Sequence, residues 1–231
     1  MRDLTFPHSK PKRSLLEAAE QLFADRGFEA VSVRDITQLA EANVAAVNYH
    51  FGSRDALIAL VVTRYITPVN EERLARLDKV ERTYAGKAVP LEEIIDAFVR
   101  PLIGTVRKSE LSERLFYKLI GRIFAMQGEG IPAEIESQFK VLSERFTRAL
   151  GKTLPSVPAE ELVWKIHFMI GGMIHMLMQQ DLLHRMTQGV SGNPSMEVIL
   201  SRFIRFAASG LRDGIDVEPK PKKGPQAMFD F

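Results

Sequence analysis

The sequence predicts an all-α protein of about nine helices, and three observations support this fold class. Apolar residues recur at helical spacing through most of the 231 residues, and no segment has the convincing alternation of a strand. Breaks rich in Gly and Pro separate the periodic segments, at residues 85–90, 128–132, 154–158 and 189–194. Hydrophobic residues make up 45% of the chain and charged residues 26%, which suits a globular protein with a sizeable core.

Residues 32–55 predict two short helices and the start of a third. Ser32 is a favourable N-cap, and Asp35 three residues later is placed as in a capping box. Asn43 can cap the second helix, and Gly52 ends it. The free face of this second helix carries small and hydrogen-bonding residues, namely Ala45, Ala46, Asn48, Tyr49 and His50.

That free face fits a DNA recognition helix. Ala45 and Ala46 allow close approach to a groove. Asn48 can bond N6 and N7 of adenine, and Tyr49 and His50 can reach phosphates or a thymine methyl group. A small surface helix on an all-α core fits the same periodicity equally well.

Residues 12–57 resemble the helix-turn-helix of the TetR family of bacterial transcription regulators. The resemblance is carried by LLEAAEQLFADRGFEAVSVRDIT before the turn and HFGSRDAL after it. Within the family, the run AAVNYHFGS is most similar to the fatty-acid-responsive, PsrA-like branch. The chain departs from the usual pattern at Glu41, where the turn usually has Gly, at Asn48, where an aromatic is usual, and at Arg54, where Lys is common.

The expected partner is a pseudo-palindromic operator in double-stranded DNA, although the predicted DNA-binding unit is not basic in bulk. The net charge of the chain is +2, and residues 8–55 hold six Lys or Arg and seven Asp or Glu. Because phosphate contacts supply much of the affinity for DNA, the placement of cations matters more than their number. The predicted DNA-binding residues are Lys12, Arg13, Ser32, Arg34, Asn43, Ala45, Ala46, Asn48, Tyr49, His50 and Arg54.

The chain divides into four parts by composition and periodicity. A long helix starts near Arg54, is expected to be kinked or broken near Pro68, and forms the only obvious mechanical link between the DNA-binding unit and the rest. The predicted parts are a flexible basic arm (1–11), the helix-turn-helix domain (12–55), a helical ligand-binding and dimerisation domain (56–213) and a disordered tail rich in Pro and Lys (214–231).

The resemblance implies an effector pocket in the helical domain. Met and Phe fill ordinary cores as readily as they line apolar pockets, so both roles stay open for these residues. A small apolar effector such as a fatty acid or acyl-CoA is expected, with Arg100 or His167 at a polar headgroup. The candidate pocket residues are Phe98, Leu102, Phe116, Ile120, Phe124, Phe139, His167, Phe168 and Met173.

The resemblance also implies that the last two helices pair with their copies in a homodimer. Gly171 and Gly172 would allow close approach of two helices, and the final helix carries an apolar stripe. The alternative is that both helices only cover the core of the monomer. The predicted interface residues are Gly171, Gly172, His175, Phe203, Phe206 and Ala207.

Catalytic and metal sites find little support in the sequence. The absence of cysteine excludes disulfides, thiol catalysis and Cys-ligated zinc. No Gly-x-Ser-x-Gly, His-Glu-x-x-His or Gly-rich phosphate loop occurs, so neither an enzyme nor a cofactor is expected. His167, His175 and His184 share one predicted helix, but a metal site would need further ligands from facing helices, and we expect none.

The N-terminus has no apolar run typical of a signal peptide, and the most apolar window, 162–178, is interrupted by charged and histidine side chains. We therefore expect a cytoplasmic, homodimeric, ligand-responsive transcription regulator, most simply a repressor that its effector releases from DNA. The alternative from another class is a helical lipid-binding or enzyme-like protein whose helix-turn-helix resemblance is incidental.

Overall fold

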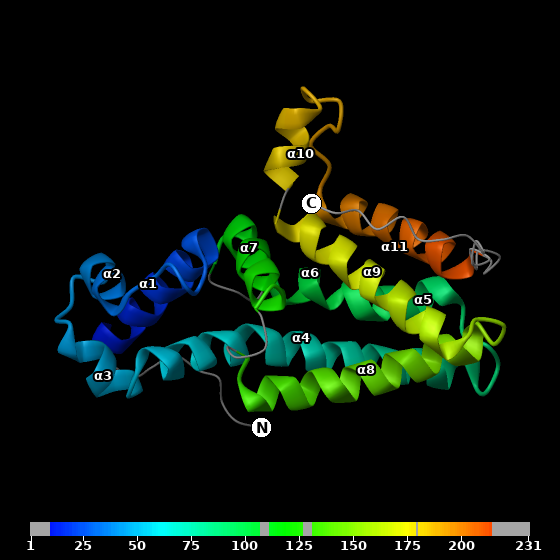
Figure 1. Ribbon diagram of the computed structural model, residues 1–231, viewed down its shortest axis with the longest axis horizontal. Helices are drawn as coiled ribbons and strands as arrows, with labels where there is room; N and C mark the ends of the chain where they lie inside the picture. Colours follow the sequence, from blue (N-terminus) through cyan, green and yellow to red (C-terminus); the bar gives the residue numbers. More distant parts are fainter. Residues whose placement is uncertain (1–9, 107–110, 127–130, 179, 214–231) are drawn as a thin grey trace, which may run out of the picture.

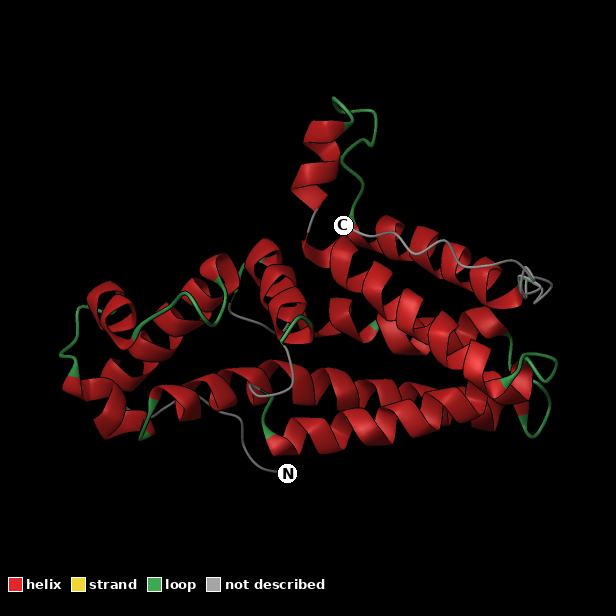
Figure 2. Ribbon diagram, in the orientation of Figure 1, coloured by secondary structure: helices red, strands yellow, loops and turns green. Residues whose placement is uncertain are grey.

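The computed structural model describes residues 10–106, 111–126, 131–178 and 180–213, which form eleven helices and no strand (Figures 1 and 2). The all-α prediction is therefore confirmed. Most of the predicted N-terminal arm and the whole predicted tail lie outside the described residues. The helices are α1 (Lys10–Arg26), α2 (Val33–Leu39), α3 (Ala45–Phe51), α4 (Arg54–Tyr84), α5 (Leu91–Val99), α6 (Pro101–Val106), α7 (Glu113–Phe124), α8 (Ala133–Thr153), α9 (Ala159–Met178), α10 (Gln180–Met186) and α11 (Met196–Arg212).

The helices form two connected groups. Helices α1, α2 and α3 gather at one end of the molecule, and α4 extends from them along the length of the larger group (Figure 1). In that larger group α4 packs against α5 and α8, while α11 packs against α5 and α9. Helix α10 projects away from the body (Figure 1). No helix among the described residues is long and apolar enough to cross a membrane.

The structure has two more helices than the sequence predicts, because two predicted helices are each divided. The segment predicted as one helix from residue 91 to about 108 ends at Val99 and resumes at Pro101. Proline cannot donate a backbone hydrogen bond, so it breaks a helix in its interior but is favourable at the first position of the next. The segment predicted from 159 to about 187 is divided into α9 and α10.

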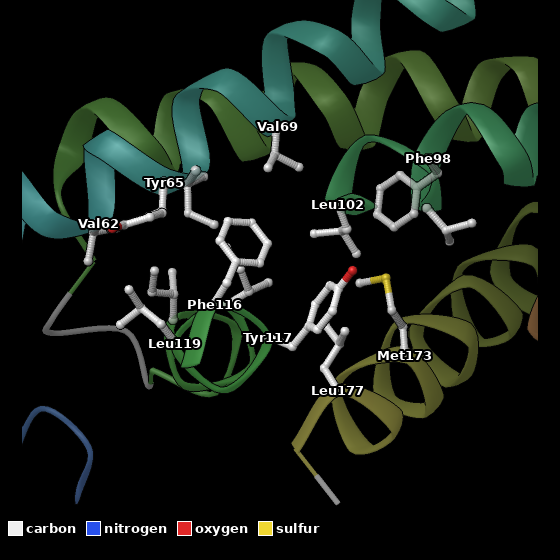
Figure 3. Packing of buried hydrophobic residues seen from close by; sticks show 14 of the residues in the cluster. Val62, Tyr65, Val69, Phe98, Leu102, Phe116, Tyr117, Leu119, Met173 and Leu177 are labelled. Carbon is white, nitrogen blue, oxygen red and sulfur yellow. The ribbon is translucent and has the colours of Figure 1, made fainter. Parts of the chain in front are cut away.

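Helix α4 continues through Pro68, so the break expected at this residue does not occur. Proline inside a helix leaves the carbonyl four residues earlier without its donor and costs about 3 kcal/mol. Burial on both sides of the proline offsets this cost: Tyr65 and Ile66 precede it and Val69 follows it, all in the core (Figure 3).

Helix α7 occupies the centre of the core and forms a second link to the DNA-binding unit. Its Phe116 ring meets the Tyr65 ring of α4 edge to face at 5.9 Å (Figure 3). On another side α7 packs along α1, where the Lys118 ammonium lies 3.2 Å from the Asp25 carboxylate. The prediction that α4 is the only mechanical link is therefore wrong, because contacts between helices distant in sequence leave no local pattern.

Candidate functional site

The predicted capping box at the start of α2 is present. The Asp35 amide donates to the Ser32 hydroxyl at 3.2 Å, and the Asp35 carboxylate accepts from the Ser32 amide at 2.8 Å and from the Ser32 hydroxyl. These hydrogen bonds to Ser32, first from its side chain and then from its backbone, lower the pKa of Asp35 despite partial desolvation, and Arg26 adds to the effect. The box fixes the start of α2 and so the geometry of the turn that follows.

The turn between α2 and α3 keeps the geometry expected of glycine although Glu41 occupies it. Glu41 has φ of +51°, the Ala42 amide donates to the Thr37 carbonyl at 2.9 Å, and the Glu41 amide donates to Gln38 at 3.3 Å. This pair of bonds is a Schellman motif, in which the left-handed residue is usually glycine. A side chain in that conformation costs about 1–2 kcal/mol, so packing around the turn holds Glu41 in a strained backbone.

Helix α3 is held mainly by Val47, with Ala46 and Phe51 partly buried against the core, and presents its other face to solvent. Val47 is completely buried beneath it, whereas Ala45, Asn48 and Tyr49 are exposed, Tyr49 to 84%. The side chain of Asn43 accepts a 2.9 Å hydrogen bond from the Ala45 amide and so caps the turn that enters the helix. The exposed face is therefore short, polar and rigidly supported. The two remaining predicted residues of this helix, Ala46 and His50, are half-buried.

The predicted cations around α3 have different surroundings. Arg34 is exposed in the first turn of α2, and the Lys12 ammonium lies 5.6 Å from the centre of the Phe51 ring. Arg13 pairs with Glu17 at 2.7 Å and lines a surface hollow beside Leu111, Ser112 and Leu115, so it faces the start of α7.

Arg54 has a local structural role that the sequence does not indicate. Its Nε donates to the Val31 carbonyl at 2.9 Å, and its Nη2 donates to the Phe28 carbonyl. The guanidinium thus holds the loop between α1 and α2 against the start of α4. A phosphate contact by Arg54 stays a prediction, and the same side chain now has an evident positioning function.

The predicted effector residues do not all lie together. Phe98, Leu102, Phe116, Ile120 and Met173 are buried in the helical domain, while Phe124 and Phe139 are half-buried and stack with ring centres 5.7 Å apart. Leu102 and Met173 point toward one another beside Phe98 (Figure 3). His167 and Phe168 are instead exposed on α9, Phe168 to 67%, because α9 is apolar on both faces and periodicity does not select the inner one.

The interior holds a charged residue that the sequence reading missed. Arg73 of α4 is completely buried; its Nε donates to the Phe98 carbonyl at 2.7 Å and its Nη1 to the Asn70 side chain at 3.2 Å. Its guanidinium lies 4.1 Å from the centre of the Phe98 ring and 5.5 Å from that of Phe124. The signal was its place on the apolar stripe of α4, between Val69 and Leu77 and without an acid one turn away.

Arg100, which we expected near the polar headgroup of an effector, already has two carboxylate partners within the protein. Its guanidinium bonds Asp96 at 2.6 Å and also Glu197 of α11. These hydrogen bonds, that from Glu197 first, raise the pKa of Arg100 despite partial burial. The side chain therefore joins α5 to α11 at the surface. His175 and His184 are exposed, and no group of three or more His, Asp or Glu suited to a metal gathers among the described residues.

The predicted dimer residues divide between two faces of α9 and α11. Gly171, Gly172, His175 and Phe206 are exposed, Phe206 to 75%. Phe203 and Ala207 are buried in the monomer, which corrects their assignment to an interface; Phe203 packs toward Gly172. Helix α11 has a distinct apolar face, and Phe206 lies outside it, so the stripe that we predicted combined buried and exposed positions. The exposed face also includes Val163 and Trp164 of α9, which we did not predict as functional residues, and Phe168, which we predicted to line the pocket.

Comparisons with known proteins agree with this arrangement. Residues 15–61 match the model for bacterial regulatory proteins of the tetR family, and residues 96–210 match the model for the Tetracyclin repressor-like C-terminal domain. Together the two matches cover most of the chain and correspond to the two helix groups.

Curated relatives match over short segments of the chain. An HTH-type transcriptional repressor of Mycobacterium tuberculosis is 43% identical over 49 residues, and the probable HTH-type transcriptional regulator YttP of Bacillus subtilis is 35% identical over 54 residues. These alignments cover 21% and 23% of this chain and 26% of each relative.

Solved structures show the fold over nearly the whole chain. The ketosteroid transcriptional regulator KstR2 of Mycobacterium tuberculosis has a TM-score of 0.58 at 16% identity, covering 89% of this chain and 96% of its own. A TetR-like transcriptional regulator from Rhodococcus sp. RHA1 has a TM-score of 0.55 at 18% identity, covering 90% and 98%. With both halves matched by family models and the same fold throughout, the chain belongs to the TetR family of bacterial regulatory proteins.

Proposed function

We propose that this protein is a sequence-specific DNA-binding transcription regulator, a repressor that acts in the cytoplasm as a homodimer. The observation that carries the proposal is the exposed polar face of α3, supported from below by Val47 and fixed by a capped, strained turn. Rigid support matters because a helix of seven residues is not stable alone. The alternative of an incidental helix-turn-helix does not agree with the family match over both halves of the chain.

In this proposal the side chains of α3 read bases and the surrounding cations hold the backbone. Asn48 is placed to donate to and accept from one adenine edge, and Tyr49 reaches a phosphate or a thymine methyl group. Arg34 contacts a phosphate, which adds affinity without sequence preference. Ala45 leaves room for the helix to approach the groove.

A mobility-shift titration against the DNA upstream of the protein's own gene tests the proposal. We expect Asn48→Ala to cost about 1–3 kcal/mol of binding free energy and to relax preference at one base pair. Asn193→Ala is the matched control, because Asn193 is an exposed asparagine in the loop after α10. If wild type and the Asn48→Ala, Tyr49→Ala double variant bind the operator DNA with equal affinity, α3 is not part of the DNA interface.

Dimerisation is supported by the outward face of α9 and α11. Trp164, Phe168 and Phe206 are each more than half exposed, and α9 and α11 lie side by side (Figure 1). Apolar surface of this extent is typical of an interaction site. A two-fold dimer through this face would present two copies of α3 to half-sites one helical turn, or a multiple of it, apart.

Release from DNA by a small apolar effector completes the proposal, and a fatty acid or acyl-CoA has suitable chemistry. A hundredfold loss of DNA affinity requires the effector to prefer the released state by about 2.7 kcal/mol. Burying two or three more methylene groups in that state supplies this amount, at about 0.8 kcal/mol each. The effector would lie among Phe98, Leu102 and Met173, where α5, α6 and α9 meet.

A further inference from the structure

Arg73 is a buried cation that has no anion beside it. No described carboxylate forms an ion pair with it, and its acceptors are neutral: the Phe98 carbonyl and the Asn70 side chain. Its Nη2 is buried and has no hydrogen-bond partner. The other arginine of the same region, Arg76, pairs with Glu72 at 2.8 Å and lies near Asp96. Arg73 is therefore a fully buried arginine that lacks the carboxylate partner Arg76 has.

Burying a charged side chain without an anion beside it destabilises the protein, and an anion bound next to Arg73 would offset that cost. Burial lowers the pKa of Arg73 to about 9, which still leaves the guanidinium protonated at neutral pH. Buried charges in proteins are normally paired or bonded through every donor, because an unmet donor keeps its full desolvation penalty. Here one nitrogen of the planar fork is unmet, and that fork is suited to two parallel bonds with a carboxylate.

The side chains around Arg73 indicate the chemistry of the rest of the ligand. The Phe98 and Phe124 rings lie against the guanidinium, and Phe146 meets Phe98 at 5.1 Å. Leu102 and Met173 lie beside Phe98 (Figure 3). A ligand that reaches Nη2 would therefore keep every part except its charged end against apolar side chains.

We propose that Arg73 is the anchor for the carboxylate of an apolar carboxylic acid, which binds in the interior of the helical domain. This inference rests on the proposed effector function and narrows it. A free acid brings a single small anion at one end of an apolar body. A coenzyme A thioester has no carboxylate at that position and carries its phosphates on a bulky polar group, which the interior does not match.

In this proposal the acid enters the interior past Phe124, and its binding there displaces the end of α7. Phe124 and its stacked neighbour Phe139 are half-buried, so they lie between solvent and Arg73. An acid that enters here displaces a ring at the end of α7, the helix that packs along α1. Ligand binding at Arg73 thus touches α4 and α7 together.

The test measures binding to the full-length protein by calorimetry, without DNA. Tetradecanoate, its methyl ester and tetradecanoyl-CoA are titrated into wild type, Arg73→Met and Arg76→Met. Methionine resembles the arginine stem in size, and replacing a buried charge by a packed apolar residue is generally neutral or stabilising, so the variant should fold. Arg76→Met removes a cation one turn away that is already paired.

We expect wild type and Arg76→Met to bind the acid at least about tenfold more tightly than the ester, the loss typical of a charge-assisted hydrogen bond. Arg73→Met should bind acid and ester equally, with a melting temperature of the unliganded protein at or above that of wild type. Equal binding of acid and ester by wild type, or acid preference retained in Arg73→Met, would overturn the anchor.

Two further outcomes show whether the carboxylate anchor at Arg73 fails alone or together with the proposed long-chain effector. Binding of the thioester alone would overturn the carboxylate anchor and leave an apolar effector in place. Binding of none of the three compounds would overturn the anchor together with the long-chain effector, while the mobility-shift result for Asn48→Ala would still decide whether the protein binds DNA.

Discussion

The exposed polar groups of α3 and the fully buried Arg73 of the helical domain lie in opposite environments. Asn48, Tyr49 and Arg34 stand in water, where their exposure costs nothing and each contact with a phosphate is weakened by salt. Arg73 is removed from water, so its burial costs several kcal/mol and a matching anion restores a large part of that cost. In the proposed function, DNA affinity would be spread over many weak contacts, whereas effector affinity would be concentrated at Arg73.

The largest expected effect on operator affinity comes from breaking the proposed dimer, because a monomer carries only one copy of α3. The Phe168→Glu, Phe206→Glu double variant should give a folded monomer, because both rings are mostly exposed, and operator affinity should fall by about 10²–10⁴ as bivalent binding is lost. Sedimentation velocity and a mobility shift measure the two effects. Phe203 is unsuitable for this test, since it is buried in the monomer.

Val141→Glu serves as the control for that variant, because Val141 is an exposed apolar residue of α8. It should leave both the dimer and the affinity unchanged. An unchanged dimer in the Phe168→Glu, Phe206→Glu protein would place the interface elsewhere.

A second comparison contrasts two arginines of the DNA-binding unit. Arg54→Ala should lower the free energy of unfolding by about 1.5–3 kcal/mol, since it removes charged hydrogen bonds to the Phe28 and Val31 carbonyls. Arg34→Ala should leave stability unchanged and reduce the salt dependence of DNA binding by about one unit. Urea unfolding and titrations at several salt concentrations measure both quantities. Equal stability of the two variants would mean that the Arg54 bonds do not hold the loop.

The smallest expected effect concerns the capping box. Ser32→Ala should cost about 1 kcal/mol and move the pKa of Asp35 up toward its ordinary value of 3.8, as seen by carboxyl NMR titration. Because the folded-state pKa is below the unfolded value, ionised Asp35 stabilises the fold above pH 3.8, and this contribution is lost as the pH falls through the lowered pKa. Ser53→Ala, which removes the separate cap of α4, should leave Asp35 unaffected.

The sequence predicted the local features and missed those that depend on packing. Ser32, Asp35 and Asn43 act within a few residues of themselves, so spacing alone identifies them. Phe168 was assigned to the interior because α9 is apolar on both faces, whereas Phe203 and Phe206 of α11 were predicted to form one stripe although only Phe203 lies on its buried face. Pro101 begins the second of two helices whereas Pro68 lies inside one, although buried residues flank both, so the sequence alone does not separate the two cases. Arg73 was missed although its place on an apolar stripe is visible in the sequence.

The two supports of the DNA-binding unit limit how it can move. A body attached at one point can turn about any axis through that point, whereas a body attached at two points can turn only about the line that joins them. Helices α4 and α7 hold the unit at two places, at the start of α4 and along α1. A shift of either helix would therefore turn α3 about one axis, and in the proposed dimer this would change the spacing of the two copies of α3 while each keeps its own shape.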